Sequence, residues 1–196
     1  MDIGVVGAGA MGRGIAQLMA QSGHRVHLFD VADGSAAAAR DDVATMLERA
    51  VEKGRTTRDE ARAAIGRLSV AEALTGLSGC DVVIEAVVED LAVKRKLVLE
   101  LEAVLHADAL IASNTSSLSI AAIARGARHP ERIAGLHFFN PVPLMKLAEV
   151  VRGVRTSPAV VDRLTDLVNG TGHTAVTVKD SPGFLVNHAG RGLYTE

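Results

Sequence analysis

The feature that most constrains the fold is a glycine-rich turn near the amino terminus. The residues Gly7-Ala8-Gly9-Ala10-Met11-Gly12 follow a short apolar run and begin a segment whose apolar residues have helical spacing. In such a turn the first glycine permits a tight reversal, the second lets a pyrophosphate approach the backbone, and the third lets helix and strand pack closely. The amino end of the helix offers free N–H groups to phosphates. The pattern therefore predicts a strand, a turn and a helix that bind a nucleotide.

A carboxylate beyond this turn indicates which nucleotide the turn binds. Asp30 ends the second expected strand, where it would accept hydrogen bonds from both hydroxyls of an adenosine ribose and repel a 2′-phosphate. Val31 and Ala32 follow rather than an arginine, which favours NAD over NADP. A turn without a ligand is the structural alternative. FAD stays open on the turn alone, although the later part of the chain offers no obvious region for a flavin ring.

The rest of the chain alternates β-branched apolar runs with stretches of helical period. This alternation predicts an α/β fold of the Rossmann type, a doubly wound and mostly parallel sheet with helices on both faces. We expect strands at residues 3–6, 25–29, 67–70, 81–86, 109–113, 133–138, 146–151 and 174–178. We expect helices to begin near Met11, Ser35, Thr57, Leu91, Leu118 and Pro158.

The segment 35–66 is longer than one crossover helix requires. It predicts a helical hairpin inserted after the second strand, with its turn near Lys53, Gly54 and Arg55. The hairpin is rich in basic side chains: Arg49, Lys53, Arg55, Arg58 and Arg62. These side chains form either a solvated face or a lip that meets an anionic ligand.

Composition limits the partners. Aromatic residues make up 3% of the chain, and 21 Lys and Arg face 23 Asp and Glu, so nucleic acid is not an expected partner. No apolar stretch reaches the roughly 18–20 residues of a membrane span. The single cysteine, Cys80, cannot form an intrachain disulfide, and no Cys/His spacing indicates a metal site. We expect a protein of the reducing cytoplasm whose first residues begin a strand rather than a signal peptide.

Two polar motifs follow the ends of neighbouring strands, where open α/β sheets bind ligands. They are Ser113-Asn114-Thr115-Ser116-Ser117 and His137-Phe138-Phe139-Asn140-Pro141-Val142-Pro143. His137 is a candidate proton-transfer group. If loop 140–145 reverses the chain, Glu149 lies near its imidazole and stabilises the protonated ring. The alternative is a strand-end histidine with Glu149 in a surface ion pair. The other six histidines lack comparable company.

Five motifs together resemble one enzyme family. They are GAGAMG at 7–12, IEAVVED at 84–90, SNTSS at 113–117, GLHFFNPVPLMKLAEVV at 135–151 and KDSPGFLVN at 179–187. In this order they resemble the NAD-binding domain of the L-3-hydroxyacyl-CoA dehydrogenases of fatty-acid β-oxidation, including the 3-hydroxybutyryl-CoA dehydrogenases. The resemblance covers nearly the whole chain and implies reversible, NAD-dependent oxidation of a 3-hydroxyacyl-CoA to the 3-oxoacyl-CoA.

The resemblance also implies residue roles. His137 would be the catalytic base and Glu149 its partner, while Ser116 and Asn187 would hydrogen-bond the reacting oxygen. Asp30 would bind the adenosine ribose, and Glu89, Lys94, Ser116 and Asn140 would lie at the nicotinamide half. In the family the helical hairpin helps to bind CoA.

The chain departs from the family near its end. Gly190 and Gly192 make the last helix richer in glycine than is common, and each interior glycine costs about 1 kcal/mol relative to alanine. We expect residues 1–180 to form the NAD-binding domain and residues 181–196 to begin a C-terminal helical domain that this chain lacks. In the family that domain carries most of the homodimer interface. Two other functions stay open: a dehydrogenase of a small polar hydroxy acid of the gulonate type, and an NAD-binding module without turnover.

Overall fold

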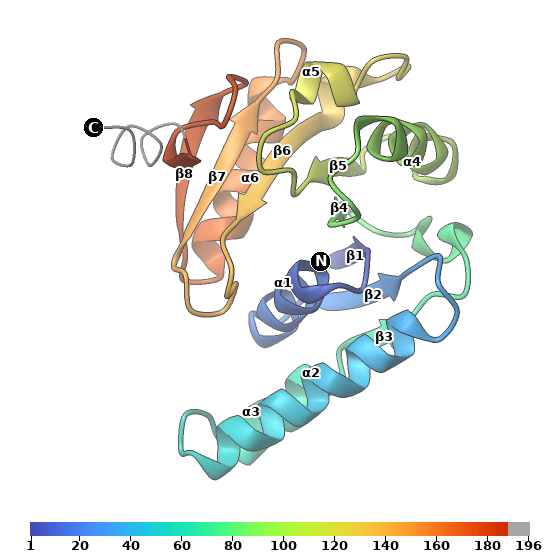
Figure 1. Ribbon diagram of the computed structural model, residues 1–196. Coiled ribbons are helices and arrows are strands. Elements are labelled where there is room, and N and C mark those ends of the chain that lie inside the picture. Colours follow the sequence, from blue (N-terminus) through green and yellow to red (C-terminus); the bar gives the residue numbers. More distant parts are fainter. Residues whose placement is uncertain (188–196) are drawn as a thin grey trace.

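The computed structural model describes residues 1–187 and contains a single sheet (Figure 1). Its eight strands lie in the order β3-β2-β1-β4-β5-β6-β7-β8. Strands β1 to β6 run parallel, β7 is antiparallel to β6, and β8 is parallel to β7. The strands are β1 Asp2–Val6, β2 Arg25–Phe29, β3 Leu68–Val70, β4 Val82–Glu85, β5 Leu110–Ser113, β6 Ile133–Phe138, β7 Leu147–Arg152 and β8 Thr174–Lys179. The expected Rossmann-type sheet is confirmed.

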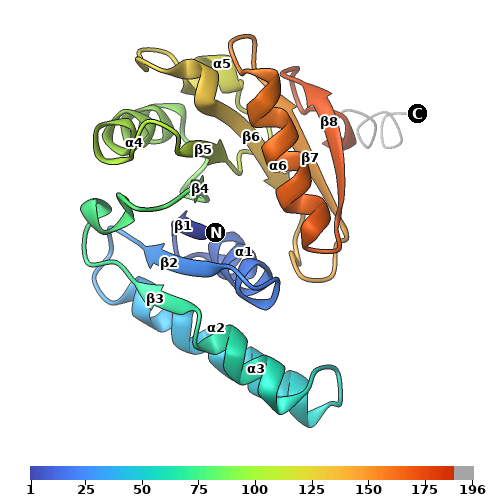
Figure 2. The ribbon, with the colours of Figure 1, turned by 180° about the vertical axis from the view of Figure 1, so that it is seen from behind.

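Helices cover both faces of the sheet (Figure 2). They are α1 Ala10–Gln21, α2 Ser35–Glu52, α3 Arg58–Ile65, α4 Leu91–Val104, α5 Ile120–Ile123 and α6 Pro158–Gly170, with short 3₁₀ turns η1 Leu74–Leu77 and η2 Pro130–Arg132. One apolar core joins α1, α2, α3 and α6 to the sheet, and a second joins α4 and α5. The adjacent residues Val5 and Val6 enter opposite cores, as the alternation of side chains along a strand requires.

The predicted hairpin insertion is confirmed as α2 and α3, which extend away from the sheet (Figure 1). Gly54 lies in its turn with φ +65°, a conformation that favours glycine. Thr57 and Glu60 then form a capping box at the start of α3, which satisfies backbone N–H groups that a helix leaves unpaired. The hairpin geometry is thus encoded locally.

Helix α5 begins two residues later than its expected start at Leu118. The hydroxyl of Thr115 accepts a hydrogen bond from the Leu118 amide at 2.9 Å, and Ser119 caps the helix by accepting from Ala122. The carboxylate of Asp180, just after β8, accepts the amides of Ile120 and Ala121 at 2.9 Å each. A carboxylate distant in sequence therefore sets this boundary.

The end of the chain is described only in part. The expected helix after Ser181-Pro182 begins as a turn over 182–185, followed by helical Val186 and Asn187. The rest of that helix, with Gly190 and Gly192, lies outside the described residues. Among the helices of residues 1–187, none is both long and apolar enough to cross a bilayer.

Candidate functional site

In the turn between β1 and α1, packing requires glycine at two positions and leaves open space beside a third glycine. Gly7 has φ +101°, and a Cβ there would lie 2.6 Å from the carbonyl oxygen of Ala86. A Cβ on Gly12 would lie 1.8 Å from the carbonyl oxygen of Gly7. A Cβ on Gly9 would meet no atom within 4 Å. The open space at Gly9, beside the amino end of α1, fits the close approach of a pyrophosphate.

Asp30 joins the turn to the end of β2. One of its carboxylate oxygens accepts the Ala8 amide at 2.7 Å and the other accepts the Ala32 amide at 2.9 Å. The carboxylate borders a cleft of about 420 Å³ between the ends of β1, β2 and β4 and the start of α4. The cleft carries exposed apolar side chains, Val31 and Val88, beside Asp30. An acid at a strand end next to an apolar slot suits the ribose and adenine of a dinucleotide.

His137 and Glu149 lie directly opposite each other on the antiparallel strands β6 and β7. The imidazole Nδ1 is 2.7 Å from Glu149 Oε2. The Glu149 side chain is 0% exposed, which excludes the alternative of a surface ion pair. Its other oxygen, Oε1, accepts the backbone amides of Leu185 and Val186 at 2.9 and 2.8 Å. These bonds supply the partners that a buried carboxylate requires.

The bond to Glu149 decides which imidazole nitrogen is available. With Nδ1 donating to the carboxylate, Nε2 is the nitrogen that can accept a proton. Within residues 1–187, no hydrogen bond occupies Nε2. The ring of Phe139 lies 4.4 Å from the imidazole and that of Phe184 lies 5.8 Å from it, between ring centroids. This apolar surround holds the ring orientation and shields the pair from water.

Glu89 accepts several hydrogen bonds from the loop that follows β5. Its Oε1 accepts from the Thr115 hydroxyl at 2.6 Å and from the amide and hydroxyl of Ser116 at 2.9 and 3.2 Å. Burial by itself raises the pKa of Glu89, but the bonds from Thr115 and Ser116 and the nearby Lys94 ammonium outweigh it, so its pKa lies below the usual value. Glu89 is therefore a charged anchor for the serine-rich loop.

Lys94 is more deeply placed than sequence reasoning anticipated. Its side chain is 1% exposed, and its ammonium lies 2.9 Å from Glu85 Oε2 and 3.4 Å from Glu89 Oε2. Sequence reasoning missed Glu85, although a glutamate at the end of the buried strand Val82–Glu85 was itself a signal, because buried carboxylates need partners. A direct contact between Lys94 and a cofactor stays a prediction.

The remaining expected residues approach the same region to different degrees. The side-chain amide of Asn187 donates to the Ser116 carbonyl at 3.0 Å, so these two residues lie side by side. Asn140 is exposed at the carboxyl end of β6. Sequence reasoning assigned no role to Asn114, whose side-chain oxygen accepts the Phe138 amide at 2.9 Å and ties the serine-rich loop to β6.

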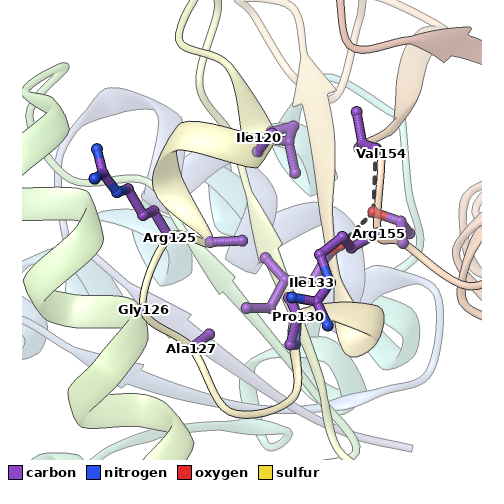
Figure 3. A pocket seen from close by; sticks show the side chains of 12 residues that line it. Ile120, Arg125, Gly126, Ala127, Pro130, Ile133, Val154 and Arg155 are labelled. Atoms are coloured by element: carbon purple, nitrogen blue, oxygen red, sulfur yellow. Dashed lines mark hydrogen bonds between the residues drawn. The ribbon is translucent and has the colours of Figure 1, made fainter.

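Other histidines and cavities differ from this site. His27 and His129 also lie near carboxylates, at 3.4 and 3.1 Å, contrary to the expectation that they lack such company, but both side chains are far more exposed than His137. A separate cavity at the amino end of β6 is lined by Ile120, Pro130 and Ile133, with Arg125 and Arg155 at its edges (Figure 3). Across residues 1–187, no three His, Cys, Asp or Glu side chains are grouped to hold a metal.

Comparison with known proteins identifies the family. Residues 2–181 match the family described as 3-hydroxyacyl-CoA dehydrogenase, NAD binding domain. The chain is 41% identical over 194 residues to the 3-hydroxyadipyl-CoA dehydrogenase of Escherichia coli K12, covering 99% of this chain and 41% of that protein. It is 42% identical to a probable 3-hydroxybutyryl-CoA dehydrogenase of Bacillus subtilis, covering 95% of this chain and 65% of that one.

A solved structure gives the same relationship in three dimensions. The crystal structure of 3-hydroxybutyryl-CoA dehydrogenase from E. coli K12 superposes with a TM-score of 0.97 at 40% identity, covering 100% of this chain and 41% of that one. The chain thus spans about two fifths to two thirds of the length of these relatives. On this sequence and structural evidence, the chain belongs to the 3-hydroxyacyl-CoA dehydrogenase family, of which it contains the NAD-binding domain.

Proposed function

We propose that this chain supplies the NAD site and the catalytic base of a dehydrogenase that oxidises a 3-hydroxyacyl-CoA to the 3-oxoacyl-CoA, reversibly. The observation that carries the proposal is the buried His137–Glu149 pair at 2.7 Å, on the sheet that carries the glycine turn. NAD, when bound, accepts the hydride from the substrate C3. The protein has to bind both ligands, orient them and take the hydroxyl proton.

His137 takes that proton at Nε2. As the C3–H bond breaks, the O–H electrons form the carbonyl and the proton moves to the imidazole. The Glu149 carboxylate stabilises the resulting imidazolium, because an opposite charge at 2.7 Å favours the charged form. In the reverse direction the imidazolium returns the proton to the carbonyl oxygen.

Ser116 and Asn187 are proposed to orient the reacting oxygen. The bond from Asn187 to the Ser116 carbonyl keeps these two polar groups adjacent. The Ser116 hydroxyl is 3.2 Å from Glu89, and rotation of this hydroxyl can turn its proton toward a substrate oxygen instead. On the cofactor side, Asp30 is proposed to bind the adenosine ribose, with Gly7, Gly9, Ala10, Met11 and Gly12 around the pyrophosphate. Glu89, Lys94, Ser116 and Asn140 are proposed at the nicotinamide half.

The basic hairpin supports an acyl-CoA substrate over a small hydroxy acid. A cleft of about 630 Å³ separates the hairpin turn from the β6–β7 loop. Its cationic lining residues are Arg49, Lys53, Arg55 and Lys146. These cations border the loop that follows His137, so a ligand that reaches from the catalytic pair to this cleft would meet them with its phosphates. This arrangement favours the anionic-lip interpretation of the hairpin.

We also propose a domain division of the chain. Residues 1–180 would form the NAD-binding domain and 181–196 would begin a helical domain, most of that stretch lying outside the described residues. The homodimer, which the family resemblance implies for a full-length protein, and the cytoplasmic location, which the single cysteine favours, stay proposals as well.

The test is NADH oxidation with acetoacetyl-CoA and, separately, NAD reduction with a gulonate-type sugar acid. In a complete protein that carries this domain, we expect turnover with the thioester, and a decrease of about 100-fold or more in His137→Ala with little change in NADH affinity. His129→Ala, which removes an exposed histidine near Glu131, is the matched control and should keep full turnover. Near-normal turnover in His137→Ala would refute the mechanism. NADH binding without any turnover would leave an NAD-binding module, and preference for the sugar acid would support the gulonate-type alternative.

A further inference from the structure

A buried polar network lies beneath the serine-rich loop, and its centre is Glu85. The carboxylate is 0% exposed. Its two oxygens lie 3.0 and 2.9 Å from the Lys94 ammonium, and Oε2 also accepts the Val87 amide at 3.2 Å. The Ser113 hydroxyl donates to Oε1. The mechanism proposed above uses neither Glu85 nor Ser113.

Two routes connect Glu85 to the loop that carries Ser116. In the first, the Lys94 ammonium contacts Glu85 and also lies 3.4 Å from Glu89 Oε2. The other oxygen of Glu89, Oε1, accepts hydrogen bonds from Thr115 and Ser116. In the second, Ser113 bonds Glu85 and also accepts the Thr115 amide at 3.3 Å. The conformation of the loop therefore depends on Glu85 from two sides.

The network lies where the second half of a dinucleotide belongs. The strand order reverses between β1 and β4, and in this fold a dinucleotide crosses the crevice at that reversal. Asp30 and the glycine turn are at the ends of β1 and β2, on the adenosine side. Glu85 ends β4 and Ser113 ends β5, on the opposite side of the switch point.

We propose that Glu85 is a positioning residue for the nicotinamide half of NAD, which it serves by fixing Lys94, Glu89 and the Ser113–Ser117 loop. The proposal rests on the assignment of NAD to this cleft. The partners of Glu85 described above, which are the Lys94 ammonium, the Ser113 hydroxyl and the Val87 amide, all donate hydrogen bonds to it. The role therefore needs two acceptor oxygens, whereas a glutamine would aim N–H groups at one of these donors. Loss of the charge at Glu85 should draw Glu89 toward Lys94 and release the loop.

The experiment compares two ligands by calorimetry on the 196-residue chain. NADH contacts both halves of the cleft, whereas ADP-ribose lacks the nicotinamide ring. In Glu85→Gln we expect NADH to bind about tenfold more weakly and ADP-ribose to bind within twofold of the unmodified chain. Glu102→Gln is the matched control, because the Glu102 carboxylate accepts the Arg128 and His129 amides at 2.8 and 2.7 Å outside this network. This control should change neither affinity.

The outcomes separate positioning from a general loss of structure. Unchanged NADH affinity in Glu85→Gln would overturn the proposal, and so would an equal loss for both ligands. Should Glu85→Gln fail to fold, Ser113→Ala removes the second route alone, and we expect about threefold weaker NADH binding with ADP-ribose unchanged. If Ser113→Ala bound both NADH and ADP-ribose as tightly as the unmodified chain does, or lost affinity for both to the same extent, the proposal would be rejected. Failure of the unmodified chain to bind ADP-ribose would instead refute the cofactor assignment, and this proposal with it.

Discussion

At the scale of single residues, Asp30 combines two functions in one carboxylate. It accepts the amides of Ala8 and Ala32, which fixes the glycine turn against the end of β2. It also lines the cleft between the ends of β1, β2 and β4, where we propose that the adenosine ribose binds. The hydrogen bonds and the charge can be separated by substitution, since an amide keeps an acceptor for one of the two backbone groups and loses the charge.

We therefore expect the chain to bind NADH at least about tenfold more tightly than NADPH, a difference of roughly 1.4 kcal/mol. Asp30→Ala should narrow this gap, and Asp30→Asn should narrow it with a smaller loss of NADH affinity, because the turn keeps one acceptor. Fluorescence titration with the two cofactors measures both effects. Equal affinity of the unmodified chain for NADH and NADPH would remove Asp30 from its proposed role.

Asp2 carries a pH-dependent contribution to stability at the opposite end of β1. Its hydrogen bonds from Arg25, at 2.6 Å from Nε, lower the pKa of Asp2 to about 2. A lowered pKa stabilises the folded state above the ordinary value near 3.8, and this stabilisation is lost as the pH falls toward 2. The pair is largely solvent-accessible on the Arg25 side, so its contribution is about 1 kcal/mol or less.

Asp2→Asn should accordingly lower the free energy of unfolding by up to about 1 kcal/mol at pH 7. The difference between variant and unmodified chain should shrink between pH 4 and pH 2, the range set by the two pKa values of Asp2. Urea unfolding across this range measures it, with the exposed Asp33→Asn as control. A difference that stayed constant to low pH would contradict an electrostatic origin.

At the scale of elements, the α2–α3 hairpin has two differently placed sets of basic side chains. Lys53 and Arg55 in its turn border the cleft that extends to the β6–β7 loop. Arg58 and Arg62 on α3 line a separate groove between the two helices. Substitution of Lys53 and Arg55 therefore tests whether the hairpin binds an anionic ligand. Substitution of Arg58 and Arg62 is a control with the same change in charge.

We expect Lys53→Glu/Arg55→Glu to weaken binding of acetoacetyl-CoA about tenfold or more, because two attractive charges become repulsive, roughly 1.4 kcal/mol or more in total. Binding of acetoacetyl-pantetheine, which lacks the nucleotide phosphates, should hardly change. Arg58→Glu/Arg62→Glu should leave both ligands near their original affinities. Calorimetry on the unmodified chain and the two double variants measures these affinities. Equal losses of acetoacetyl-CoA affinity in the two double variants would show that the basic side chains of the hairpin are only a solvated face.

At the scale of the whole molecule, one continuous sheet joins the two apolar cores. The cleft beside Asp30 lies at the carboxyl ends of β1, β2 and β4, which are neighbouring strands of this one sheet. We therefore expect the strands on either side of the cleft to unfold together. A ligand that binds only the folded state raises stability according to its concentration relative to Kd. Ligand binding at the cleft should consequently raise the free energy of unfolding of the whole sheet.

We predict a single thermal transition over residues 1–187 that NADH shifts upward as a whole. At 100 times Kd the stabilisation is about 2.7 kcal/mol, which for a chain of this size raises Tm by about 5–10 °C. Differential scanning calorimetry measures the shift, and Asp30→Ala should show a smaller one at the same NADH concentration. Two transitions, of which NADH moves only one, would show that the halves of the sheet unfold separately.

Local patterns determined much of this protein. The glycine turn, the alternation of strands and helices, the Thr57 start of α3 and the Gly54 turn follow from steric and hydrogen-bonding preferences of neighbouring residues. The same patterns put His137 and Asp30 at the ends of strands, where ligands bind in such a sheet. These features could be predicted because each depends on residues within a few positions of one another.

Only the tertiary structure decided how the polar groups share their partners. The buried Glu149 carboxylate accepts the amides of Leu185 and Val186. Asp180, which follows β8, accepts the first amides of α5. Lys94 lies beneath the serine-rich loop because Glu85 and Glu89 both face it. Each of these arrangements joins residues from separate elements, and burial forces a charged group to satisfy its hydrogen bonds with whatever the fold brings near. A linear pattern specifies which groups need partners, whereas the packed sheet selects which partners they find.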